Sequence, residues 1–153
     1  MSASISALIE RGGVFCDVDG TTPEEIFNDV VSRVDFPADL DRNEVIRELI
    51  EREKVLSTAV GGGLSIPHPK RPLLKKADDE RIIVCFLKKH ISMQAPDTRP
   101  VFAFFIVLSS SPVSHLKFLS SLAKIFHDIE FRRLLETRPS KARLVSFLQK
   151  MSF

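Results

Sequence analysis

The sequence has no tryptophan, no tyrosine and only two cysteines among its 153 residues. Its aromatic residues are twelve phenylalanines, which lack a polar handle and are therefore expected to fill the core. Two cysteines are too few for a disulfide framework, and Cys85 lies inside the apolar run RIIVCFL, where a thiol behaves as a small buried hydrophobe. These absences exclude a disulfide-stapled scaffold and favour a reducing compartment.

Long hydrophobic runs and a strong charge of either sign are also missing. The longest apolar run, VFAFFIVL, has the length of a buried strand and falls far short of the roughly 20 residues of a membrane-spanning helix. The N-terminal segment MSASISALIERGG lacks the basic start and long apolar stretch of a signal peptide. A formal net charge of +2 gives no general reason to expect nucleic acid as a partner. The sequence therefore predicts a soluble, cytoplasmic protein without membrane insertion.

Helical and strand patterns alternate along the chain, and we predict a single domain over residues 1–153. The runs RIIVCFL and VFAFFIVLS are typical of central strands covered on both faces, and VFCDV is expected as a shorter strand. Interleaved helices and apolar strands imply an α/β sheet with helices on both faces. Helices are expected at 4–11, 21–34, 41–56, 110–128, 130–137 and 139–151. In the fourth of these, the predicted inward stripe is Leu116, Leu119, Leu122, Ala123 and Phe126.

The segment STAVGGGLSIPHPK, residues 57–70, places His68 between two prolines and shortly after three glycines. The prolines disfavour helix and remove backbone donors, so the imidazole is displayed from a stiff, extended segment. Gly61, Gly62 and Gly63 leave backbone amides uncovered, which suits close approach by a phosphate or a partner protein. A neutral imidazole is available as a nucleophile near neutral pH. From these features alone, an ordinary proline-rich surface loop is an equal alternative.

His115 follows the apolar run VFAFFIVL and the polar turn SSSPVS, in the first turn of a predicted helix. A helix N-terminus favours an anion, and Ser110, Ser111 and Ser114 supply hydroxyl donors. The loop after the carboxyl end of a strand is also where ligands bind in open α/β sheets. His115 is therefore a candidate site residue, and the alternative is a histidine that only forms local hydrogen bonds.

Other chemistries fit the sequence less well. A phosphate-binding P-loop needs Gly-Lys-Ser/Thr after its glycines, which GGGLSI lacks, and no HxxH, HExxH or CxxC spacing suggests a metal site. A cysteine nucleophile needs an exposed thiol, whereas Cys85 is expected to be buried. His90 is given no role, and His127 is expected to cap its helix. A histidine that accepts a phosphoryl group, supported by a second histidine and an arginine, fits best.

Two separate motifs carry a family resemblance. The first comprises Arg52-Glu53, Ser57-Thr58, the three glycines and Ile66-Pro67-His68-Pro69. The second is HLKFLSSLA, which begins at His115. Together they resemble the enzyme IIA domain of the bacterial phosphoenolpyruvate-dependent sugar phosphotransferase system, fructose/mannitol type, nearest to its stand-alone nitrogen-regulatory branch. The resemblance covers nearly the whole chain and implies a single mixed β-sheet flanked by helices on both faces.

This resemblance implies that His68 is phosphorylated by the phosphocarrier protein HPr or a nitrogen-branch paralogue. His115 would be the second active-site histidine, and Arg52 would bind phosphate oxygens through its planar guanidinium. No cofactor is implied, because the phosphoryl group is itself what is transferred. The acceptor would be a IIB domain in sugar transport, or phosphorylation would change the binding of a regulatory target. The 153 residues contain no IIB, IIC or HPr segment, which favours regulation.

One position departs from the family pattern. The glycine-rich turn commonly reads Gly-Asn-Gly or carries a carboxylate at its centre, and this chain has Gly62 there. The missing side chain is expected to remove a hydrogen bond near His68. The alternative function is therefore a regulatory binding module that keeps the IIA fold and has lost phosphotransfer.

Overall fold

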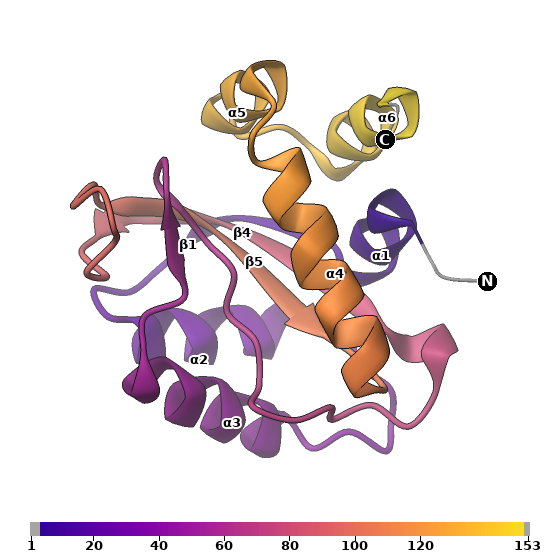
Figure 1. The fold of residues 1–153 in the computed structure, drawn as a ribbon. Coiled ribbons are helices and arrows are strands. Elements are labelled where there is room, and N and C mark those ends of the chain that lie inside the picture. Colours follow the sequence, from indigo (N-terminus) through magenta and orange to yellow (C-terminus); the bar gives the residue numbers. More distant parts are fainter. Residues whose placement is uncertain (1–3, 152–153) are drawn as a thin grey trace.

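The structure, a computed structural model, describes residues 4–151 (Figure 1). Within this range five strands form one sheet in the order β1-β4-β5-β3-β2. The strands are β1 (Val14–Val18), β2 (Ala59–Gly61), β3 (Leu64–Ser65), β4 (Arg81–Ile91) and β5 (Val101–Leu108). The helices are α1 (Ile5–Gly12), α2 (Pro23–Arg33), α3 (Arg42–Val55), α4 (Pro112–Ile125), α5 (Ile129–Glu136) and α6 (Lys141–Lys150), with a 3₁₀ turn, η1 (Ala77–Asp79). Residues 1–3 and 152–153 of the predicted domain lie outside the described range.

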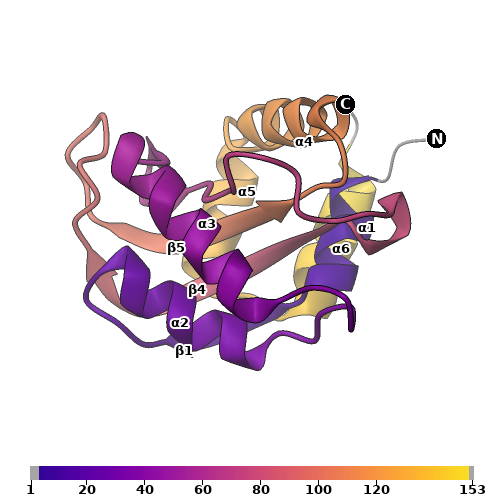
Figure 2. The same cartoon turned by 90° about the horizontal axis from the view of Figure 1, so that it is seen from below.

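The sheet is mixed and covered by helices on both faces, which confirms the predicted fold class. β4 and β5 run antiparallel, whereas β1 pairs with β4 and β3 pairs with β5 in parallel. α1, α4, α5 and α6 cover one face, and α2 and α3 cover the other (Figures 1 and 2). On β4, Ile82 and Val84 face the first core, and Ile83 and Cys85 face the second. Their side chains are fully buried, as the unbroken apolar run predicts.

Each α-helix of residues 4–151 begins at a polar side chain that accepts a hydrogen bond from a backbone N–H of the first turn. Such a cap satisfies one of the donors that a helix N-terminus leaves unpaired. The helix starts predicted at Thr22 and Asp41 are confirmed. The capping residues are Ser4, Thr22, Asp41, Ser111, Asp128 and Ser140. No helix in this range is long and apolar enough to cross a bilayer.

α4 packs on the sheet through a stripe that differs from the predicted one. Leu116 is 68% exposed and Ala123 is also exposed, so the prediction was wrong at these two positions. The buried positions of α4 are Phe118, Leu122 and Ile125. Apolar residues of this helix fit two overlapping stripes of helical period, and only packing against the sheet selects between them.

The three consecutive glycines form the tight turn between β2 and β3. Gly61, Gly62 and Gly63 have φ angles of 94°, 66° and 80°, a left-handed region that glycine adopts without strain. The Gly62 N–H donates to Asp97 Oδ2 at 2.8 Å, and Gly63 O accepts from the Phe102 N–H at 2.8 Å. The turn therefore lies beside the start of β5.

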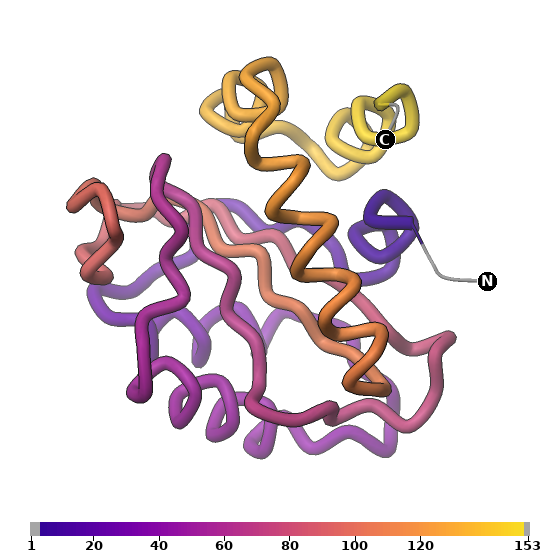
Figure 3. The backbone as a smooth tube through the Cα atoms, viewed as in Figure 1, coloured from indigo at the N-terminus to yellow at the C-terminus, as the bar shows by residue number. Residues whose placement is uncertain are grey.

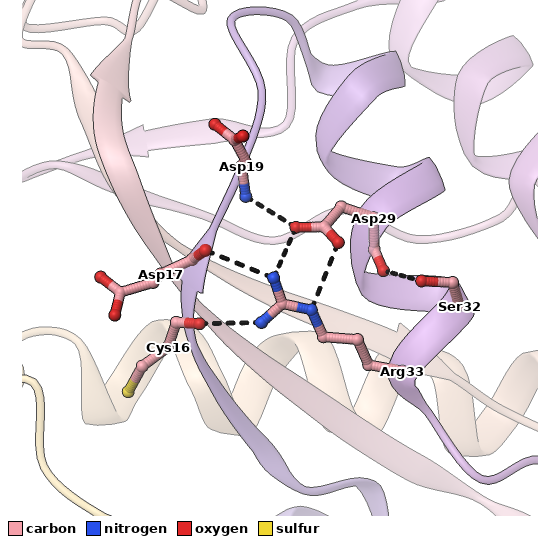
Figure 4. A network of polar contacts seen from close by, with 6 residues as sticks. All are labelled: Cys16, Asp17, Asp19, Asp29, Ser32 and Arg33. Carbon is pink, nitrogen blue, oxygen red and sulfur yellow. Dashed lines mark hydrogen bonds and ion pairs between the residues drawn. The ribbon is translucent and has the colours of Figure 1, made fainter.

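A polar corner joins β1 to α2 (Figure 4). The Arg33 guanidinium donates to both oxygens of Asp29, at 3.2 and 2.8 Å. It also donates to the backbone carbonyls of Cys16 and Asp17, at 2.9 and 3.3 Å. Asp29 Oδ2 accepts a further hydrogen bond from the Asp19 N–H at 2.7 Å. One arginine thus ties the end of β1 to the last turn of α2.

Candidate active site

His68 lies in an extended segment that follows β3 and runs alongside β5 toward the start of α4 (Figure 3). Backbone hydrogen bonds hold this segment on both sides. The Ile66 N–H donates to Thr58 O at 3.0 Å, and the Val107 N–H donates to Pro67 O at 2.9 Å. Both prolines that flank His68 are buried. The stiff, extended display predicted from the Pro-His-Pro sequence is present.

The imidazole of His68 is held in one tautomer. Its Nδ1 lies 2.8 Å from Ile66 O. Because a carbonyl oxygen can only accept, the neutral ring carries its hydrogen on Nδ1 and its lone pair on Nε2. No other residue in the range 4–151 forms a hydrogen bond with this ring. Nε2 is therefore the ring nitrogen whose lone pair is available to act as a nucleophile.

The structure brings the three predicted site residues together from three elements. His115 lies in the first turn of α4, and its ring centroid is 4.9 Å from that of His68, with the ring planes tilted by 55°. Arg52 lies in the last turn of α3, where its Nη1 donates to Leu56 O at 2.7 Å. The Arg52 charge lowers the pKa of both histidines, so it lies near both rings.

Burial is the main cause that lowers the pKa of His68 below its ordinary value of 6.5. His115 and Arg52 lower that pKa further, whereas the hydrogen bond to Ile66 O raises it. The pKa of His115 is also lowered, first by burial and then by Arg52. Both rings are therefore neutral at pH 7, and a neutral imidazole is the form that can act as a nucleophile.

We expect the ring nitrogen resonances of His68 and His115 to titrate with midpoints below 6.5. The rings stay neutral at pH values where an ordinary imidazole has begun to bind a proton, because both are half-buried beside a cation. Removing that cation in Arg52→Ala should raise both midpoints. Two-dimensional nitrogen–proton NMR of the imidazoles measures them, and a wild-type midpoint above 6.5 for either ring would contradict the arrangement.

Glu53 supports the segment that carries His68. Its Oε2 accepts from the Thr58 N–H at 2.8 Å, and its Oε1 accepts from the Thr58 hydroxyl at 2.7 Å. That hydroxyl is also 2.8 Å from Ser65 Oγ on β3, and Thr58 and Ser65 are both buried. The adjacent residues of the Arg52-Glu53 motif therefore have different contacts. The charge of Arg52 acts on both histidines, and Glu53 holds Thr58, which directly precedes β2.

Sequence reasoning missed Glu80, a carboxylate that is only 4% exposed and directly precedes β4. Its Oε2 accepts from the Ser110 N–H at 2.9 Å, the Ser110 hydroxyl at 3.0 Å and the Ser114 hydroxyl at 2.5 Å. The Ser111 hydroxyl accepts from the Ser114 N–H. The prediction that these hydroxyls are available to an incoming anion was therefore wrong, because an internal carboxylate occupies the start of α4. No pattern in the sequence indicates that Glu80 contacts Ser110, because the two residues are 30 positions apart.

Gly62 lies far from His68. The glycine turn is beside Phe102 at the start of β5, whereas the His68 segment is bonded to Val107, five residues further along the strand. At about 3.3 Å per strand residue, this separation is about 16 Å. The Gly62 N–H is also engaged by Asp97. The expected loss of a hydrogen bond near His68 has no support in this geometry, and the turn does not offer its amides to a phosphate at His68.

Exposed aliphatic side chains lie close in the chain to Arg52 and to His115. The end of α3 contributes Val55 and Leu56, which are 77% and 69% exposed. The first turns of α4 contribute Val113 and Leu116, which are 78% and 68% exposed. We call these four residues the apolar rim. Several exposed aliphatic side chains near the ends of the two helices that carry Arg52 and His115 favour a surface that contacts another protein.

The remaining candidate groups do not join this site. Cys85 is buried, as predicted, and burial raises the pKa of its thiol, so it is no nucleophile. His90 and His127 are both exposed, at the end of β4 and after α4 respectively. No group of three or more histidine, cysteine, aspartate or glutamate side chains within residues 4–151 is arranged to hold a metal ion.

Comparison with known proteins assigns the chain to a family. The family described as "Phosphoenolpyruvate-dependent sugar phosphotransferase system, EIIA 2" matches residues 7–151. The chain therefore belongs to the EIIA family of this phosphotransferase system, and the resemblance drawn from the two motifs is confirmed.

Relatives from the nitrogen-regulatory branch share both sequence and fold with the chain. A nitrogen regulatory protein of Bradyrhizobium diazoefficiens is 31% identical over 106 residues, which are 68% of this chain and 67% of that protein. Nitrogen regulatory protein IIA-Ntr from Neisseria meningitidis has a TM-score of 0.80 and 25% identity, covering 94% of this chain and 98% of its own. The Escherichia coli complex of enzyme IIAMTL with phosphorylated enzyme IIBMTL has a TM-score of 0.66 at 15% identity, covering 91% of this chain and 95% of its own, which is a likeness of fold alone.

Proposed function

We propose that this chain is a cytoplasmic phosphocarrier whose His68 accepts a phosphoryl group from the phosphohistidine of an HPr-type protein. The observation that carries the proposal is the 2.8 Å hydrogen bond between His68 Nδ1 and Ile66 O, which leaves the lone pair on Nε2. Membership of the EIIA family supports it. His115 and Arg52 support it too, because both are near His68 and can donate hydrogen bonds to phosphoryl oxygens.

In the proposed transfer, the Nε2 lone pair of His68 forms a bond to phosphorus as the N–P bond of the donor breaks. The imidazole of the donor takes the electron pair of the broken bond. His68 loses no proton, because Nε2 carries none, and its Nδ1–H continues to donate to Ile66 O, which stabilises the positive charge that the ring acquires. Arg52 and His115 stabilise the phosphoryl oxygens, so the protein supplies position and charge.

The apolar rim supports a protein as donor and acceptor. Its four aliphatic side chains offer a contact area for HPr or a nitrogen-branch paralogue, and then for a IIB domain or a regulatory target. Similarity to nitrogen regulatory proteins favours the regulatory output. Phosphorylation of His68 places about two negative charges beside the rim near pH 7, which is enough to change the affinity for a docked partner.

The proposal is tested by incubating the protein with phosphoenolpyruvate, enzyme I and HPr and then measuring its intact mass. We expect a gain of one phosphoryl group that is lost in acid. A known IIA protein in the same mixture serves as the control. No gain under conditions that phosphorylate the control would contradict the proposal and support the alternative, a IIA-fold binding module without phosphotransfer.

Gly62→Asn is expected to leave the initial rate of phosphorylation within about twofold of the wild type, because position 62 is remote from His68. A Cβ there meets nothing closer than Arg132, at 3.9 Å, and asparagine tolerates the left-handed backbone. In the matched variant Gly63→Asn, a Cβ would lie 2.6 Å from the Phe102 ring, so that variant should lose stability. A large rise in rate in Gly62→Asn would show that the glycine does limit transfer.

A further inference from the structure

Glu80 is a buried carboxylate that the proposed transfer does not use, and we infer that it is a positioning residue for His115. The inference rests on the proposed function, since it concerns the geometry of the same histidine pair. At 4% exposure, Glu80 is closed off from any docked protein. Its effect on transfer must therefore pass through the residues that it holds.

The contacts of this carboxylate all go to the turn that begins α4. Glu80 Oε2 accepts two hydrogen bonds from Ser110 and one from Ser114, the residue directly before His115. The nearby arginines, Arg11 and Arg81, donate to backbone carbonyls and not to this carboxylate, and the carbonyls that Arg11 reaches include that of Glu80. Within residues 4–151 no salt bridge reaches Glu80, and its carboxylate lies at the positive end of the α4 dipole. By accepting from Ser110 and from Ser114, the Glu80 carboxylate fixes both ends of the turn that begins α4.

The distance between the two histidines depends on two anchors at the end of β5. One is the Val107 N–H, which holds the segment of His68, and the other is the Ser110 N–H, which Glu80 holds. Because Glu80 directly precedes β4, its backbone is placed by the register of β4 against β5. The sheet thereby sets the 4.9 Å separation of the two rings. It holds the His68 segment through the Val107 N–H and the start of α4 through the Glu80 side chain.

The test compares Glu80→Ala with Glu80→Gln in the phosphorylation assay. Alanine removes the acceptor, and we expect the maximal rate to fall about tenfold, because small displacements of a catalytic group are costly. The HPr concentration at half-maximal rate should not change, since Glu80 touches no docked protein. Glutamine keeps an acceptor oxygen and should restore most of the rate. The control is Asp29→Asn, which alters another hydrogen-bonded carboxylate at the β1–α2 corner and should keep the wild-type rate.

A second readout does not require phosphotransfer. In Glu80→Ala, the NMR titration midpoint of His115 should move toward 6.5 as the start of α4 loosens, whereas Asp29→Asn should leave it unchanged. Both readouts are taken at a temperature where circular dichroism shows each variant to be folded. If Glu80→Ala does not fold, Ser114→Ala removes one of the three donors with little change in volume and should show the same changes to a smaller degree.

The results distinguish the positioning role of Glu80 from the proposed function of the protein. A wild-type maximal rate or an unchanged His115 midpoint in folded Glu80→Ala overturns the positioning role, as does a rate that glutamine fails to restore. A raised half-saturating HPr concentration with a normal maximal rate overturns it too, because it would indicate a docking defect. If the wild-type protein takes up no phosphoryl group, the proposed function fails, and the His115 midpoint still decides the role of Glu80.

Discussion

His68→Ala is expected to abolish phosphoryl uptake from HPr, because the substitution removes the nitrogen that forms the bond to phosphorus. The intact mass after incubation with phosphoenolpyruvate, enzyme I and HPr should equal that of the untreated variant. The fold should survive, since the His68 side chain is half-buried and its hydrogen bond in residues 4–151 is the one to Ile66 O. Circular dichroism and the thermal midpoint, both close to wild type, establish that the loss is chemical.

Two other histidines serve as matched controls for this result. His90→Ala should be phosphorylated at the wild-type rate, because His90 is exposed at the far end of β4. His115→Ala keeps the proposed nucleophile and loses the group proposed to stabilise the phosphoryl oxygens, so its rate should fall by about 10² without reaching zero. Phosphoryl uptake by His68→Ala, or its loss in His90→Ala, would falsify the assignment of His68.

Phe105→Ala is expected to lower the free energy of unfolding by about 3–5 kcal/mol, because it leaves a large cavity under the helices. Phe105 is fully buried on β5, and its ring centroid is 5.0 Å from that of Phe126 and 6.3 Å from that of Phe131. A loss of this size is a large share of the roughly 5–15 kcal/mol that a domain has in total. Urea denaturation followed by circular dichroism measures it.

The control for this variant is Phe15→Ala, which removes a half-buried ring from the edge strand β1. Part of the space that it vacates is open to water, so the loss should be clearly smaller than that of Phe105→Ala. Equal losses for the two variants would contradict the expectation that the buried cavity left by Phe105 sets the size of the loss.

The sequence predicted the parts of the fold that depend on local pattern. Two unbroken apolar runs became the central strands, and helix starts such as Thr22 and Asp41 were confirmed, because caps act within one turn. The hairpin of β2 and β3 was not predicted, since strands of three and two residues carry no periodic signal. The exposure of Leu116 was also missed, because its side chain fits a helical stripe that the sheet does not select.

The candidate site shows the same division between local and distant information. Arg52, His68 and His115 were predicted from motifs, and the structure places them together, while their roles in transfer stay predictions. The position of Gly62 was misjudged because six residues of extended chain carry the glycine turn away from His68. Glu80 was missed because its contact with the start of α4 exists only once β4 and β5 are in register.

The polar corner of Arg33 and Asp29 affects whether copies of this protein can associate through the edge of the sheet. The outer strands of an open sheet have unpaired backbone N–H and C=O groups. A strand of another chain can pair with these groups, which is a common route to aggregation. On β1, the carbonyls of Cys16 and Asp17 are already covered by the Arg33 guanidinium (Figure 4). A foreign strand would have to break an ion pair before it could add to the sheet. These contacts at β1 thus discourage self-association through this edge of the sheet.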